Sequence, residues 1–151
     1  MLRSGTVMDG SWRASVKNAL LWFDVVFTLV LVAFAVRFGS RNAIWYAGLG
    51  LTAICLPLWI VARRELGSSF SVTAQARQLV THGLYSKLRN PIYVFGGLAN
   101  LGGLLALQIW PLVVASLAMT PIQIVRIRKE EKVLAAAFGP AYEEYRAKTW
   151  F

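Results

Sequence analysis

Two clusters of polar and charged side chains bracket the longest uncharged stretch of this sequence, and they are its best candidates for chemistry. The first cluster spans residues 79–93 and reads LVTHGLYSKLRNPIY; the second spans residues 126–132 and reads RIRKEEK. Ionisable groups at the edge of an apolar segment are costly to place there, so they often mark functional sites. Cations, carboxylates, an amide and tyrosines together suit a zwitterionic ligand.

The stretch between the clusters, residues 91–125, contains no charged residue. It is too long for one membrane helix and just long enough for two. Residues 108–111 are the expected turn, because Pro111 fits the first turn of a helix, where its missing N–H costs nothing. A hairpin returns to the side from which it starts, so the two clusters should meet there. The side chains expected to approach one another are Arg89, Asn90, Tyr93, Arg126, Glu130 and Glu131.

Such a meeting predicts a pocket with a cationic side, an anionic side and a floor of small residues from the first arm of the hairpin. These small residues are Gly96, Gly97, Ala99, Gly102, Gly103 and Ala106. Small residues at this spacing also let membrane helices approach closely, and the sequence leaves both uses open. The charged clusters themselves could equally be snorkelling arginines and a solvated charge run.

The chain as a whole favours an all-α fold, an integral membrane helical bundle. It is 57% hydrophobic and only 15% charged, where about a quarter is typical of soluble proteins. A domain of this size cannot hide so much apolar surface from water. Since about 20 apolar residues cross the hydrocarbon core, we expect four transmembrane helices at 19–38, 42–62, 92–107 and 109–126. Cytoplasmic helices should follow, with a stop at Gly139 and an amphipathic segment at 141–148 that carries Tyr142 and Tyr145 on one side.

The distribution of charge predicts the orientation. Basic residues gather in the link after the second apolar run and in the tail after the fourth, so the positive-inside rule puts both termini and the link in the cytoplasm. The net charge of +9 is then explained by anionic headgroups, and we expect neither nucleic-acid binding nor a metal site. The single cysteine, Cys55, allows no intramolecular disulfide. The polar N-terminal segment indicates a retained first helix rather than a signal peptide.

Asp24 is the one acid within the first apolar run. It lies near the cytoplasmic end of the predicted helix, where solvation among the headgroups is the simpler interpretation. If it points inward, it should pair with an arginine of the link that follows the second helix.

The two clusters together resemble the integral membrane methyltransferases typified by isoprenylcysteine carboxyl methyltransferase, a pattern that phospholipid methyltransferases share. After residues 79–93 and two hydrophobic helices comes Arg-x-x-x-Glu-Glu-x-x-Leu-x-x-x-Phe-Gly-x-x-Tyr-x-x-Tyr, filled here by Arg126, Glu130, Glu131, Leu134, Phe138, Gly139, Tyr142 and Tyr145. The resemblance covers residues 63–151 and is specific, because both halves and their separation match. It implies one domain over 1–151, in which a helix pair (1–62) precedes a cofactor-binding core (63–151).

The resemblance implies an S-adenosylmethionine-dependent methyltransferase that acts on a lipophilic acceptor at the cytoplasmic membrane face, with a prenylated cysteine carboxylate as the nearest family substrate. It places Arg77, Gln78, Leu79, Val80, His82, Tyr85, Asn90, Pro91, Ile92, Tyr93, Glu130 and Glu131 around the cofactor, and Arg126 and Arg89 in catalysis. The chemistry is compatible, because a carboxylate pairs with an ammonium, aromatic faces stabilise a sulfonium and an arginine holds an acceptor carboxylate. Methyl transfer needs no protein nucleophile, so alignment and exclusion of water would carry catalysis.

The sequence departs from the family at one position. The commonest family motif has Arg-His-Pro where this chain has Arg89-Asn90-Pro91. Asparagine keeps a hydrogen-bonding side chain but cannot titrate, so no mechanism can use a histidine proton there. His82 is the only histidine, and a lone histidine near an interface is more often a structural hydrogen-bonder than a base.

Three alternatives stay open. The acceptor could be a phospholipid amine or another lipophilic molecule, although an arginine facing an amine makes less sense. A membrane reductase related to the sterol reductases would have a similar C-terminal architecture, but the Glu130-Glu131 pair suits the phosphates of NADPH poorly. A non-catalytic membrane scaffold could also retain the fold.

Overall fold

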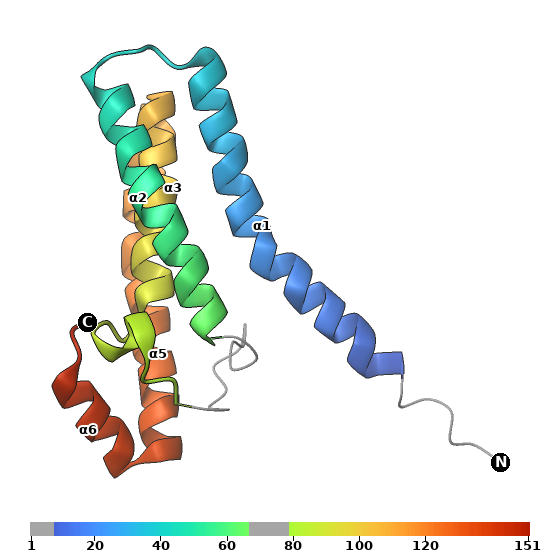
Figure 1. Ribbon diagram of the computed structural model, residues 1–151, viewed down its shortest axis with the longest axis vertical. Helices are drawn as coiled ribbons and strands as arrows, with labels where there is room; N and C mark the ends of the chain where they lie inside the picture. The colour runs from blue at the N-terminus through green and yellow to red at the C-terminus, as the bar shows by residue number, and fades with distance from the viewer. Residues whose placement is uncertain (1–7, 67–78) are drawn as a thin grey trace.

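The computed structural model describes residues 8–66 and 79–151, with side chains from residue 22 onward. Over these residues the chain is helical, apart from turns and an isolated bridge between Leu88 and Trp150. The helices are α1 (Met8–Phe38), α2 (Ala43–Leu66), the short 3-10 helix η2 (Gly83–Ser86), α3 (Pro91–Leu107), α4 (Trp110–Ala118), α5 (Thr120–Phe138) and α6 (Pro140–Lys148) (Figure 1). The predicted all-α class is confirmed.

The predicted helix boundaries are partly correct. The segments 19–38, 42–62 and 92–107 lie in α1, α2 and α3, although α1 begins earlier, at Met8, and α2 continues to Leu66. The helix predicted at 109–126 is interrupted at Met119 and continues beyond residue 126. The chain forms α4, which ends at Ala118, and then α5, which runs unbroken to Phe138. Pro121 accounts for the break, because it has no N–H for the carbonyl four residues earlier and its ring crowds that carbonyl.

The turns lie where the sequence predicts them. Gln108 ends α3 in the left-handed conformation, with φ of 59°, and Pro111 occupies the first turn of α4. Gly139 ends α5 with φ of 50°, and α6 begins at the next residue. At the turn between α3 and α4, the side-chain amides of Gln108 and Asn42 bind each other over 3.0 and 3.2 Å. The start of α2 is thereby fixed to the end of α3.

The α2–α3 interface shows what most of the small residues do. A Cβ atom at Gly102 would lie 2.5 Å from Oγ1 of Thr52, and one at Gly96 would lie 2.8 Å from the Trp59 ring. The Thr52 hydroxyl, 2% exposed, donates to the backbone carbonyl of Ala99 over 3.0 Å. The glycines of α3 therefore allow close helix packing, and the predicted glycine-rich pocket floor is wrong at these positions. Gly97 differs, because a Cβ atom there would meet nothing within 4 Å.

Helix α1 packs against α2 and α3 through apolar side chains such as Val25 and Leu31, makes a few polar contacts, and diverges from the other helices toward its own N-terminal end (Figure 1). The Thr28 hydroxyl donates to Oδ1 of Asn100 over 2.7 Å. Asp24, whose side chain is 55% exposed, lies 3.8 Å from the buried guanidinium of Arg63. Asp24 is thus half-exposed, as the simpler interpretation expects, and it also pairs with Arg63, which the sequence analysis assigned to the link and which the structure places in the last turn of α2.

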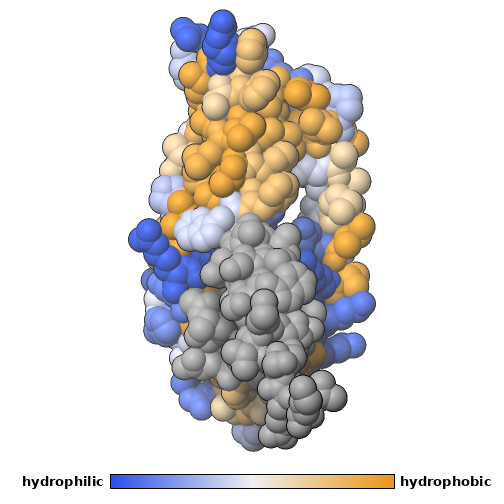
Figure 2. All heavy atoms as spheres, turned by 90° about the vertical axis from the view of Figure 1, so that its right-hand side faces the viewer, coloured by the Kyte–Doolittle hydropathy of each residue, from blue (hydrophilic) through white to orange (hydrophobic). Residues whose placement is uncertain are grey.

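Two helical stretches among the described residues are long and apolar enough to cross a membrane. These are Ala43–Leu66 and Trp110–Phe138, the latter made of α4 and α5 taken together, whereas Pro91–Leu107 is shorter. Large apolar side chains such as Phe23, Phe34 and Val114 are exposed, and apolar side chains cover much of the upper part of the face in Figure 2. This surface supports association with a membrane. Four crossings and a cytoplasmic orientation remain predictions.

Candidate active site

Both polar clusters lie at one end of the molecule, opposite the turn between α1 and α2, where η2, the start of α3, the second half of α5 and α6 gather (Figure 1). The predicted hairpin therefore returns to the side from which it starts. As a result, residues 79–93 face residues 126–132 across this end.

Glu65 holds η2 in place from the last turn of α2. Its Oε2 accepts a hydrogen bond from the Leu84 N–H over 2.8 Å, and its carboxylate lies directly against Gly83. Gly83 has φ of 58°, which favours glycine, and a side chain would also collide with the carboxylate. The sequence analysis did not single out Glu65. The one feature of the sequence that could have drawn attention to Glu65 is that no other acid lies between Asp24 and Glu130.

Pro91 decides how Arg89 and Asn90 reach the second cluster. It opens α3, and a residue that precedes proline avoids the helical conformation. Asn90 accordingly has φ of −127° and ψ of 49°, outside the helix. Both side chains can then cross to α5 instead of following the α3 surface.

Glu130 is the centre of the first contact group. The Tyr93 hydroxyl donates to its Oε1 over 2.6 Å, a length typical of a bond to an ionised carboxylate. Nε of Arg126 lies 3.4 Å from the same oxygen, and the guanidinium carbon lies 5.7 Å from the centre of the Tyr93 ring. The contact group unites a carboxylate, a phenol and a guanidinium, and the Glu130 side chain is 24% exposed.

Glu131, the next residue of α5, points to a different set of partners. Its Oε1 lies 3.4 Å from Nε of Arg89 and accepts from Nδ2 of Asn90 over 3.3 Å. Successive residues of a helix point about 100° apart, so one turn of α5 supplies carboxylates to two separate places. The predicted approach of the two clusters is confirmed for all six side chains.

The C-terminal segment closes over residues 85–90. The Tyr145 hydroxyl donates to the backbone carbonyl of Tyr85 over 2.8 Å, and burial raises the pKa of Tyr145 to about 12. The backbone N–H of Arg89 donates to the Trp150 carbonyl over 3.0 Å, and the Trp150 N–H donates to Lys87 over 2.8 Å. α6 and the residues that follow it therefore fix the backbone that carries Arg89 and Asn90. The sequence analysis included Tyr145 in the family pattern but did not predict this contact.

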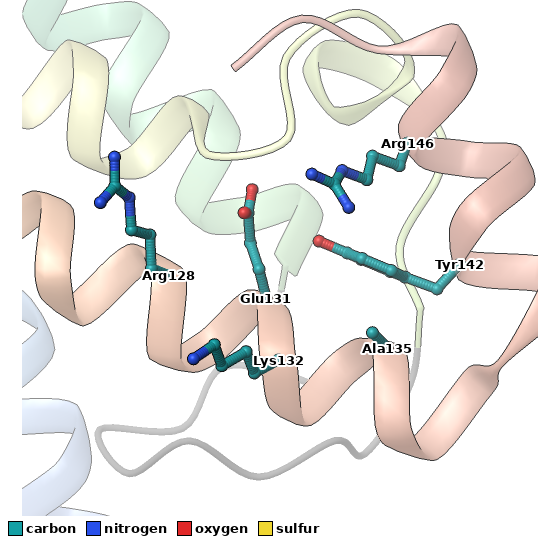
Figure 3. A pocket seen from close by; sticks show the side chains of 6 residues that line it. All are labelled: Arg128, Glu131, Lys132, Ala135, Tyr142 and Arg146. Carbon is teal, nitrogen blue, oxygen red and sulfur yellow. The ribbon is translucent and has the colours of Figure 1, made fainter.

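A cavity of about 300 Å³ lies between α5 and α6, beside Glu131. Its lining residues are Arg128, Glu131, Lys132, Ala135, Tyr142 and Arg146 (Figure 3). Of these, only Glu131 was among the predicted site residues. The others escaped prediction because their meeting depends on how α6 folds back after Gly139.

The remaining predicted site residues have varied surroundings. Val80 and Tyr85 are buried and pack against Ala62 at the end of α2, and Ile92 packs against this cluster. Pro91 is fully buried, Leu79 is partly buried and His82 is exposed. Burial raises the pKa of the Tyr85 phenol. Arg77 and Gln78 lie outside the described residues, and a role for any of these residues at a cofactor remains a prediction.

Comparison with known families agrees with this arrangement. The family model for phospholipid methyltransferases matches residues 43–141, which include α2, both polar clusters and the start of α6. The chain belongs to this family. Family membership and the apolar helices together support the membrane and methyltransferase assignments.

Two curated relatives resemble the chain more distantly. A protein-S-isoprenylcysteine O-methyltransferase from Dictyostelium discoideum is 27% identical over 129 residues, covering 72% of this chain and 48% of the relative. The cobalt-zinc-cadmium resistance protein CzcN from Cupriavidus metallidurans is 31% identical over 127 residues, covering 83% of this chain and 58% of the relative. The chain thus spans about half the length of these relatives. No solved structure matches it significantly.

Proposed function

We propose that this chain transfers the methyl group of S-adenosylmethionine to a lipophilic acceptor at the membrane surface, preferably to a carboxylate such as that of a prenylated cysteine. The observation that carries the proposal is the contact group of Tyr93, Glu130 and Arg126. It joins an anion and a cation at the point where α5 changes from apolar to charged sequence. A water-borne cofactor and a lipid-borne acceptor can both reach such a position.

The residues present fit the cofactor. The Tyr93 and Arg126 contacts of Glu130 both involve Oε1, which leaves Oε2 suited to the cofactor ammonium. The face of the partly buried Tyr93 ring suits a sulfonium, whereas Tyr85 is buried in the core beneath the site. When bound, S-adenosylmethionine supplies a methyl group activated by positively charged sulfur. Tyr93 would fix the orientation of Glu130, and Glu130 in turn would fix the cofactor.

Arg126 is the group proposed to hold the acceptor. Its side chain is 45% exposed and lies over the Tyr93 ring, so a carboxylate arriving from the bilayer can bind it without displacing buried groups. The acceptor oxygen would form the new bond to the methyl carbon as the bond to sulfur breaks and its electrons stay on sulfur. An ionised carboxylate has no proton to lose, so this reaction needs no base. That agrees with asparagine rather than histidine at position 90.

The second candidate acceptor is a phospholipid amine, and the description of the family that matches the chain favours it. An ammonium headgroup must lose a proton before it accepts a methyl group, so that reaction requires a base. Glu130 and Glu131 are the carboxylates at this end of the molecule that could take the proton.

The decisive experiment compares methyl incorporation from labelled S-adenosylmethionine into a prenylcysteine analogue and into phosphatidylethanolamine. Labelling of the prenylcysteine supports the carboxylate proposal, and labelling of phospholipid alone contradicts it. Glu130→Gln should weaken cofactor binding by about tenfold or more, because a charge-assisted hydrogen bond is lost. Glu144→Gln is the matched control, since Glu144 is 70% exposed and pairs with Lys148. Equal affinity in both variants would remove Glu130 from the cofactor site.

A further inference from the structure

Apart from Glu131, the residues that line the cavity between α5 and α6 have no part in the proposed methyl transfer. Arg128 and Lys132 flank it from α5, and Arg146 points into it from α6 (Figure 3). The described residues provide no ion-pair partner for Arg128 or Lys132, and among them Arg146 forms an ion pair with Glu143, an exposed one at 3.9 Å. Exposed pairs of this kind contribute little, so three cationic groups are available around one small space.

Glu131 is the only acid in the lining, and its charge is already matched. It lies 3.4 Å from Nε of Arg89 and also accepts from Asn90. The three cations therefore remain uncompensated within the cavity. A ligand with one or two negative charges would balance them, whereas a cationic or neutral ligand would not.

Tyr142 provides an independent observation. The residue is only 2% exposed, and the described residues give its hydroxyl no hydrogen-bond partner. Figure 3 shows this hydroxyl pointing from α6 into the cavity, between Arg146 and Glu131. A buried phenol normally donates its proton to a partner. This hydroxyl is therefore available to donate to an acceptor inside the cavity.

We propose that this cavity binds a phosphate group, held by Arg128, Lys132 and Arg146 and by a hydrogen bond from the Tyr142 hydroxyl. Phosphate offers several acceptor oxygens, and guanidinium groups match its geometry. The phosphate can belong to a phospholipid headgroup, because the cavity lies at one end of a bundle with an apolar surface, or it can be free in solution. The inference does not depend on the proposed methyl transfer, and its test requires no turnover.

The test is calorimetric titration of the purified full chain in neutral detergent at constant ionic strength, with two probes. One probe is inorganic phosphate, and the other is dihexanoyl phosphatidic acid below its micellar concentration. Arg146→Gln should weaken binding about tenfold or more, because a charged contact is lost, and Tyr142→Phe should weaken it several-fold. Lys132→Gln, on the exposed side of α5, tests the same site if the Arg146 variant fails to fold.

Lys148→Gln is the control, since it removes one positive charge from the same helix outside the cavity. Equal affinities of the two probes would assign the site to free phosphate, and tighter binding of the lipid would assign it to a headgroup. Equal weakening by Lys148→Gln and Arg146→Gln would overturn the proposal, because the binding would then reflect net charge alone. So would displacement of phosphate by S-adenosylmethionine, which would give the cavity to the carboxylate of that cofactor.

Discussion

The Tyr93 hydroxyl lies 2.6 Å from Oε1 of Glu130 and joins the first turn of α3 to the middle of α5. This bond orients the carboxylate that also contacts Arg126. Without it, Glu130 would be free to pair with Arg126 alone, in a geometry set by that arginine. Tyr93 is therefore expected to act through Glu130.

Tyr93→Phe tests this relationship. We expect kcat/KM for methyl transfer to fall by about tenfold, since one hydrogen bond to a charged group contributes about 1.5–3 kcal/mol, while the thermal stability changes little. Steady-state kinetics and thermal unfolding of the same preparation measure both effects. Tyr46→Phe is a suitable control, because Tyr46 is 63% exposed. A Tyr93 variant with unchanged kinetics would contradict the positioning role.

Gly102→Ala should destabilise the chain. The new Cβ atom would meet Oγ1 of Thr52 at 2.5 Å and the backbone oxygen of Gly48 at 2.7 Å, and overpacking of this kind costs about 1–3 kcal/mol. Gly97→Ala, on the same helix, would meet nothing within 4 Å and should be neutral or slightly stabilising. Thermal unfolding in detergent compares the two. Equal effects would show that α2 and α3 do not pack as described.

We expect Glu65 to stabilise the backbone around Leu84 as a hydrogen-bond acceptor rather than through its charge. Glu65→Ala leaves the Leu84 N–H without its 2.8 Å partner, and an unsatisfied donor costs about 1–3 kcal/mol. Glu65→Gln retains an acceptor oxygen and should lose less. Hydrogen exchange of residues 79–90, read by mass spectrometry, should accelerate in the alanine variant and stay close to wild type in the glutamine variant. The opposite order would exclude this role for Glu65.

We expect ionisation of Tyr145 to lower the stability of the folded chain at high pH. Its pKa is raised from an ordinary value near 10 to about 12 in the folded chain, chiefly by burial. Because the pKa of Tyr145 is higher in the folded chain than in the unfolded chain, its contribution to the free energy of unfolding is fully present below pH 10. This contribution is lost as the pH rises toward 12. The loss from this group is up to about 2 kcal/mol.

The Tyr145→Phe variant separates this effect from general alkaline unfolding. It should be less stable than wild type at pH 8, because the bond to Tyr85 is gone, but its stability should fall less between pH 10 and 12. Unfolding midpoints at several pH values measure the difference. Parallel curves for the variant and the wild type would rule out Tyr145 as the source.

The sequence predicts the helical class from its apolar runs, and it predicts the meeting of the two polar clusters from an uncharged stretch long enough for a hairpin. It also predicts the stops at Gln108 and Gly139 from local turn chemistry. It does not predict the break before Thr120. The residues around Pro121 are apolar, so hydropathy alone does not indicate that this proline interrupts the helix. The use of Gly96 and Gly102 was also undecided, because small residues suit a helix contact and a ligand equally well until the partner helix is placed.

The cavity beside Glu131 illustrates a different limit of prediction. Arg128 and Lys132 are recognisable as part of a basic run, but Arg146 and Tyr142 belong to a helix whose direction depends on the left-handed Gly139. Which side chains share a space after such a turn is a property of tertiary packing. The family pattern includes Tyr142 without indicating what its hydroxyl faces.

Glu130 and Glu131 are neighbours on one rigid helix, yet they face different partners across the end of the bundle. A small rotation or shift of α5 that improves the position of one carboxylate must move the other as well. If ligands bind near both, their affinities are thermodynamically linked, and each ligand changes the affinity of the other by the same factor. Two acids that are adjacent in the sequence thereby connect the place proposed for methyl transfer to the cavity beside Glu131.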